Sequence, residues 1–161
     1  MGEPEPEVMF TALRSQILEL DPAKSGLHPT DTLRHVWGAM LETGYDSGVA
    51  TVVSLKDGTT SLYSSAGFGI IGGGAHADVI LATARFLAGV EASLDQLPSE
   101  PTPALPGEGQ TIIRALTFDG RRAISAPEGD FGNGAHPLSP LFYAGQAVIT
   151  ELQLISEQRE T

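Results

Sequence analysis

The 161-residue sequence contains no cysteine, which excludes disulfide bonds, thiolate-bound zinc, iron–sulfur clusters and a cysteine nucleophile. Basic residues are also scarce, because nine Lys and Arg stand against 20 Asp and Glu and give a net charge of −11. A surface of this sign repels phosphate backbones and anionic lipids. We therefore expect no nucleic-acid partner and no membrane partner.

Long apolar runs are absent too: none approaches the length of a membrane span, and the N-terminus lacks the basic and apolar regions of a signal peptide. This favours a cytoplasmic location. The common catalytic and nucleotide-binding motifs G-x-x-x-x-G-K-[ST], G-x-S-x-G and H-E-x-x-H do not occur. We assign no catalytic residue, no metal ligand and no cofactor, and we favour a protein without catalytic activity while leaving an enzyme open.

The composition fits a single domain over residues 1–161, with 41% hydrophobic residues and with 19 Gly and 11 Pro that indicate many tight turns. Residues 1–7 form an acidic end that we expect to fray. Four prolines fall within residues 97–110 and predict a stiff, extended connector that crosses the surface of the domain.

Apolar residues at helical spacing predict four helices. The first spans Val8–Leu20, and the second begins at Thr30 or Asp31 and ends at Gly44 as its left-handed C-cap. The third, over Ala75–Leu94, carries a broad apolar face that includes Val79, Ile80, Phe86, Leu87, Val90 and Leu94 and predicts a largely buried helix. The fourth runs from about Ser139 to Ile155.

Two β-hairpins are predicted, each with an Asp-Gly turn of the kind that joins antiparallel strands. Their strands are Val49–Leu55 and Thr59–Ser65 around Asp57-Gly58, and Thr111–Phe118 and Arg121–Ala126 around Asp119-Gly120. A Gly-containing loop follows each hairpin; the second is Pro127–Gly134.

The two halves of the chain carry the same short motifs in the same order. Gly74-Ala75-His76 follows the first hairpin, and Gly134-Ala135-His136 follows the second. The order strand, Asp-Gly turn, strand, Gly loop and helix thus occurs twice. This repetition suggests a duplicated unit, although shared turn chemistry could also produce it. In either case the order of the elements predicts an α+β fold. We expect a mainly antiparallel sheet of four to five strands, with about four helices, built from a pseudo-duplicated unit.

The two Gly-Ala-His loops are the candidate ligand sites, because backbone N–H groups before a helix can hold an anion and two imidazoles could share a ligand. The candidate ligand-binding residues are Gly72, Gly73, Gly74, His76, Gly132, Gly134 and His136. The alternative is structural: glycines that permit a tight bend, and histidines that pack at helix starts. Gly67, Gly69 and Gly72 match a dinucleotide fingerprint, but the preceding strand belongs to a hairpin, which argues against it.

Two stretches, DGTTSLYSSAGFGIIGGGAH (Asp57 to His76) and HPLSPLFYAGQAVI (His136 to Ile149), resemble a family of small uncharacterised bacterial proteins that brings no known activity. More remotely, the order helix, hairpin, helix, strands, helix is similar to that of roadblock-type domains. That resemblance implies a central antiparallel sheet, dimerisation and a role as a scaffold or as a partner of small GTPases.

The expected function is that of a protein-interaction or scaffold module that forms a homodimer through an apolar helix or an edge strand. Candidate contact groups are the aromatic residues Trp37, Tyr63, Phe68, Phe131 and Tyr143, although a core position is favoured for Phe68 and Phe131. One alternative is a small-molecule or anion-binding protein, or an enzyme, that uses the Gly-Ala-His loops. Another is a component of a larger assembly whose acidity suits a basic partner.

Overall fold

The computed structural model describes residues 5–67, 69–71 and 76–160. Within these ranges the chain forms four α-helices: α1 (Pro6–Leu18), α2 (Ala77–Ala92), α3 (Glu128–Gly132) and α4 (Ser139–Glu160). A short 3-10 helix, η2 (Leu94–Gln96), follows α2. The strands are β1 (Val36–Tyr45), β2 (Gly48–Leu55), β3 (Thr60–Ser64), β4 (Gly69–Ile71), β5 (Gln110–Thr117) and β6 (Gly120–Pro127).

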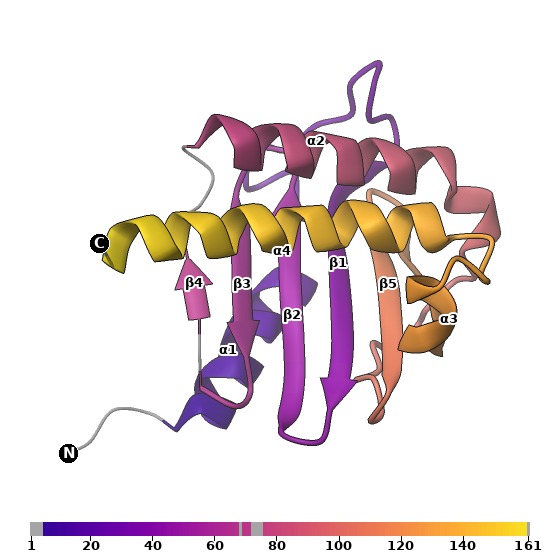
Figure 1. Ribbon diagram of the computed structural model, residues 1–161. Coiled ribbons are helices and arrows are strands. Elements are labelled where there is room, and N and C mark those ends of the chain that lie inside the picture. Colours follow the sequence, from indigo (N-terminus) through magenta and orange to yellow (C-terminus); the bar gives the residue numbers. More distant parts are fainter. Residues whose placement is uncertain (1–4, 68, 72–75, 161) are drawn as a thin grey trace.

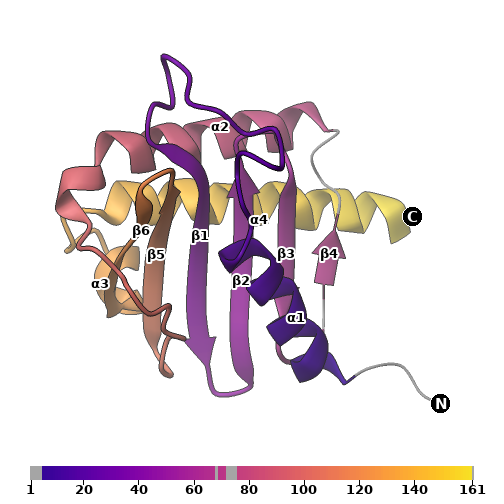
Figure 2. The ribbon, with the colours of Figure 1, turned by 180° about the vertical axis from the view of Figure 1, so that it is seen from behind.

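These strands form one antiparallel sheet in the order β4-β3-β2-β1-β5-β6. Helices α2 and α4 lie side by side on one face of the sheet, and α1 crosses the opposite face (Figures 1 and 2). The predicted α+β class with a mainly antiparallel sheet is therefore confirmed. Five strands of at least five residues make up the sheet, and the three-residue β4 extends one edge.

The predicted second helix is wrong, because the segment from Val36 to Tyr45 is the central strand β1. Each residue of β1 except Tyr45 is buried, since the sheet is covered on both faces. A strand buried on both faces reads as a continuous apolar run, and such a run can mimic helical spacing. The register shift between Val36 and Gly38 adds to this resemblance, because a bulge interrupts the alternation expected of a strand.

The two predicted hairpins are confirmed as β2–β3 and β5–β6. Gly58 and Gly120 adopt the positive φ values of +94° and +125° that an Asp-Gly turn requires. The predicted loop Pro127–Gly134 differs from the structure, because part of it folds into α3 and buries Phe131. The first, third and fourth predicted helices are present as α1, α2 and α4.

The sheet separates two hydrophobic clusters. The larger one lies between the sheet and the pair α2 and α4, and includes Leu41 of β1 and Phe86 of α2. The smaller one lies on the opposite face, where Phe10 of α1 meets Tyr63 edge to face at a centroid distance of 5.5 Å. Because α1 buries only Phe10 completely, polar contacts contribute to its attachment.

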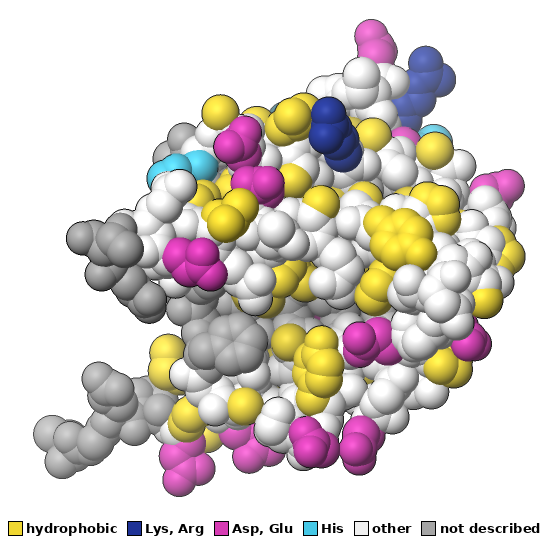
Figure 3. Space-filling model, viewed as in Figure 1, with side chains coloured by type: hydrophobic (Ala, Val, Ile, Leu, Met, Phe, Trp, Pro, Cys, Tyr) yellow, Lys and Arg dark blue, Asp and Glu magenta, His cyan; other side chains and the backbone are white. Residues whose placement is uncertain are grey.

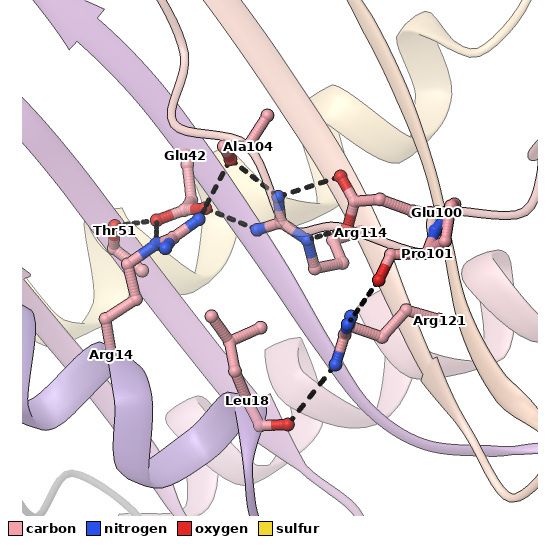
Figure 4. Close-up of polar contacts among 9 residues, drawn as sticks. All are labelled: Arg14, Leu18, Glu42, Thr51, Glu100, Pro101, Ala104, Arg114 and Arg121. Atoms are coloured by element: carbon pink, nitrogen blue, oxygen red, sulfur yellow. Dashed lines mark hydrogen bonds and ion pairs between the residues drawn. The ribbon is translucent and has the colours of Figure 1, made fainter.

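A buried carboxylate supplies those contacts (Figure 4). Glu42 projects from β1 onto the face covered by α1, and its side chain has no exposed surface. Each of its two oxygens accepts two hydrogen bonds: Arg14 of α1 reaches both, Arg114 of β5 reaches one and Thr51 of β2 reaches the other. The carboxylate thus ties α1 to three strands of the sheet.

The Pro-rich segment 97–110 joins the same network. Arg114 donates from Nε to Glu100 at 2.5 Å and from Nη2 to the Ala104 carbonyl at 2.8 Å. Further along, Gly109 donates to the Gly44 carbonyl at 2.9 Å, and a side chain at Gly44 would lie 2.2 Å from the Gly107 oxygen. The segment thus contributes Glu100 to the buried network, which its composition did not predict.

Candidate interaction surface

The two histidines of the Gly-Ala-His motifs lie apart. Helices α2 and α4 run antiparallel, so their first residues lie at opposite ends of the helical layer (Figure 1). His76 immediately precedes α2, and His136 lies three residues before α4. Gly72, Gly73 and Gly74 lie outside the described residues, as does Phe68. A ligand shared by the two histidines is therefore not supported by this arrangement.

His136 has a local role in the turn that leads into α4. Its Nδ1 accepts a hydrogen bond from the Leu138 N–H at 2.9 Å, and its ring lies 4.5 Å from that of Phe131. Gly134 adopts a φ of +81° in the same turn, and Gly132 ends α3. These residues fit the structural alternative, in which a histidine packs near the start of a helix.

His76 is the N-cap residue of α2, and its side chain makes no capping hydrogen bond. Its carbonyl accepts a hydrogen bond from the Ile80 N–H at 3.0 Å, which begins the helix. Within the described ranges no group of three His, Asp or Glu side chains is arranged to hold a metal ion.

A cleft of about 750 Å³ opens between the end of α2, the start of the 97–110 connector and the β5–β6 turn. Most of the charged side chains that line it form hydrogen bonds with other segments of the chain. Glu91 accepts hydrogen bonds from the backbone N–H groups of His35 and Val36 and contacts the His35 ring at 2.9 Å. Burial raises the pKa of Glu91, but these donors outweigh it and leave the pKa below its ordinary value. Arg122 donates to two carbonyls that follow α2.

Of the aromatic contact candidates in the described chain, Trp37, Tyr63 and Phe131 are buried, and Tyr143 of α4 is 48% exposed. The core position favoured for Phe131 is thus confirmed. Tyr143 begins a row of exposed residues along α4 at helical spacing, which continues through Ala147 and Thr150 to Leu154. The outer side of α4 therefore carries three apolar groups in line.

The outer face of α2 is more apolar still. Its exposed residues are Ala77, Asp78, Ile80, Leu81, Ala84, Arg85, Ala88 and Ala92. Six of the eight are apolar, and Ile80 and Leu81 are 47% and 49% exposed. Figure 3 shows several hydrophobic side chains exposed over the α2 and α4 layer, among polar and charged ones. The expected burial of Ile80 is thus wrong, because α2 has more apolar residues than one face of the sheet can cover.

A shallow groove of about 320 Å³ lies between α2 and α4 on this outer side. Because the helices are antiparallel, Asp78 of α2 and Glu151 of α4 stand at one end of the groove, and Arg85 stands at the other. Within the described part of the chain, the side chains of Asp78 and Arg85 have no hydrogen-bond or ion-pair partner. Leu81 lies between them in the sequence and lines the same groove.

A second hollow, of about 470 Å³, adjoins the opposite side of the α2 face. It lies between α2 and the segments around Leu33 and Lys56, with Ile80 at its rim. Lys56 donates to the Leu33 carbonyl at 3.2 Å and so fixes the segment that forms one wall. The outer face of α2 thus has a hollow on each side, a shape into which the side chains of a partner can fit.

The outer edge of β6 is partly covered. The Ala123 N–H donates to the Pro98 carbonyl, and the Glu100 N–H donates to the Arg121 carbonyl, both at 2.9 Å. Pro127 ends the strand and has no N–H to offer. Covering an edge and placing proline on it are both ways in which proteins prevent strand pairing. Of the two expected contact surfaces, the apolar helix is therefore favoured over this edge strand.

Comparison of the chain with protein-family models, curated proteins and solved structures gives no match. In the described chain no helix is both long and apolar enough to cross a bilayer. The function is therefore inferred from the chemical character of the surface.

Proposed function

We propose that this protein is a non-catalytic protein-interaction module that forms a homodimer through the outer face of α2. The observation that carries the proposal is the composition of that face, six of whose eight exposed residues are apolar. Contiguous apolar surface of this kind on a soluble domain is typical of a contact site.

Burial of the exposed apolar side chains of this face contributes favourable free energy to association. Burying a Leu or Ile side chain completely contributes about 1.5 to 3 kcal/mol, and Ile80 and Leu81 are each roughly half exposed. In a symmetric dimer each of these residues is buried twice. The alanines add area and, because they are small, let two helices approach closely.

Charge also favours α2 over the rest of the surface. Two copies with a net charge of −11 repel each other at long range. The exposed face of α2 carries one acid, Asp78, and one base, Arg85, so its own charge is balanced. Two copies can therefore meet through α2 with less local repulsion than an acidic surface would impose.

Sedimentation equilibrium over a wide range of protein concentration tests the proposal. We expect the wild type to be a dimer, Leu81→Asp to be a monomer, and Leu154→Asp to remain a dimer. The last variant is the matched control, since Leu154 is 45% exposed on α4. A wild-type protein that stays monomeric at every concentration contradicts the proposed function.

A further inference from the structure

We propose that two copies of the chain pack α2 against α2 in antiparallel orientation, about a two-fold axis close to Leu81, with Asp78 of each copy paired to Arg85 of the other. This inference rests on the proposed function, because it specifies how the same face recognises a second copy. It starts from the spacing of the two charged residues on α2.

Asp78 and Arg85 are seven residues apart, which is about two helical turns and about 10 Å along the axis. They flank the same side of the exposed face, because both line the groove toward α4. When a helix meets its own copy in antiparallel orientation, each flank faces the same flank of the copy with the direction reversed. Asp78 of each copy then lies next to Arg85 of the other copy, so the dimer contains two such pairs.

The apolar residues agree with this register. An axis midway between Asp78 and Arg85 passes between Leu81 and Ala82, so it places Leu81 against Leu81 of the second copy. On the other flank, the same axis places Ile80 beside Ala84 of the second copy, so a large side chain faces a small one. A single axis position thus pairs the opposite charges and also places large side chains next to small ones.

Glu151 of α4 strengthens the same arrangement. It lines the groove at the Asp78 end, so Arg85 of the second copy would approach two carboxylates. An axis placed near Asp78 would instead bring the two Asp78 side chains together, and an axis near Arg85 would bring the two guanidinium groups together. Like charges in such contacts oppose association.

Charge exchange tests this register. Asp78→Arg places arginine at both positions, and Arg85→Asp places aspartate at both. Each variant alone replaces two attractive contacts by two repulsive ones, and we expect its dimer dissociation constant to rise about tenfold or more. The double variant Asp78→Arg/Arg85→Asp restores opposite charges, and we expect its dissociation constant to return toward the wild-type value.

A mixture of the two single variants is the sharpest comparison, and native mass spectrometry can resolve it by mass. We expect heterodimers to dominate, since the two arginines of the Asp78→Arg chain would face the two aspartates of the Arg85→Asp chain. Glu157→Arg, which changes the charge of an exposed α4 residue equally, is the control and should leave the dimer intact.

The outcomes separate this inference from the proposed function. If the wild type dimerises but both single variants dimerise as tightly as it does, the antiparallel register is overturned and the interaction module stands. If the single variants dissociate but the mixture and the double variant do not recover, the reciprocal pairing is overturned. A monomeric wild type overturns both.

Discussion

The guanidinium of Arg114 donates a hydrogen bond to the carboxylate of Glu42 across two neighbouring strands, and neither side chain reaches solvent. Burial raises the pKa of Glu42, but the hydrogen bonds and positive charges of Arg14 and Arg114 outweigh it and hold the pKa below its ordinary value. Both groups are therefore charged in the folded protein, and each favours the charged form of the other.

Glu42→Gln should destabilise the protein by about 3 kcal/mol, because it leaves a buried arginine with less negative charge around it. Two guanidinium groups, those of Arg14 and Arg114, would then have Glu100 as their remaining carboxylate in the network. Urea denaturation followed by circular dichroism measures the change in the free energy of unfolding.

The matched control for that substitution is Glu108→Gln, which removes the same charge from an exposed position in the 97–110 connector. We expect it to change the free energy of unfolding by less than about 0.5 kcal/mol. Equal effects of the two substitutions would show that the buried network contributes no particular stability.

Stability should fall in acid. The unfolded-state pKa of a glutamate is about 4.3, and the folded-state pKa of Glu42 is lower, so its contribution is present above that pH and is lost as the pH falls through the folded pKa. In Glu42→Gln the decline of the unfolding free energy below about pH 4.3 should be shallower. Part of the slope should remain, because the pKa of Glu91 is lowered as well. Identical slopes in wild type and variant would argue against this account.

Gly44→Ala should destabilise the protein by about 1 to 3 kcal/mol, because the new methyl group would lie 2.2 Å from the Gly107 carbonyl oxygen and push the connector off β1. Gly107→Ala is the comparison, since a side chain there meets no atom within 4 Å. Thermal unfolding of both variants distinguishes a close backbone contact from a general intolerance of alanine in this segment.

His136→Ala should lower the melting temperature by about 2 to 4 °C, because it removes one hydrogen bond to the Leu138 N–H and the contact with Phe131. His76→Ala should leave it nearly unchanged, since the His76 side chain makes no capping bond. Calorimetry of the two variants measures this asymmetry. If His76→Ala were the more damaging substitution, the His76 side chain would have a role that its contacts do not account for.

The elements that depend on the sequence of a single turn could be predicted from the sequence. The Asp-Gly turns at Asp57 and Asp119 predicted both hairpins, because those turns need a glycine with positive φ whatever surrounds them. Strand β1 was missed because its identity depends on tertiary burial: covered on both faces, it retains no alternation to distinguish it from a helix.

The candidate surface was harder to predict than the fold. Periodicity showed that α2 has a broad apolar face, but it could not show how much of that face the sheet and α4 would cover, and so Ile80 was expected to be buried. The partners of Glu42 were also hidden, because Arg14, Glu100 and Arg114 are far apart in the sequence and only the sheet brings them together. A lone acid within an apolar strand was the one available signal.

The most direct test of the account is disulfide cross-linking through an engineered cysteine, which the cysteine-free sequence allows without background. Leu81→Cys places a thiol next to the proposed two-fold axis, and Leu154→Cys places one on α4 as the control. Under mild oxidation the account predicts a covalent dimer for Leu81→Cys and little or none for Leu154→Cys on a non-reducing gel. Failure of Leu81→Cys to cross-link, or equal cross-linking of both variants, would contradict dimerisation through α2.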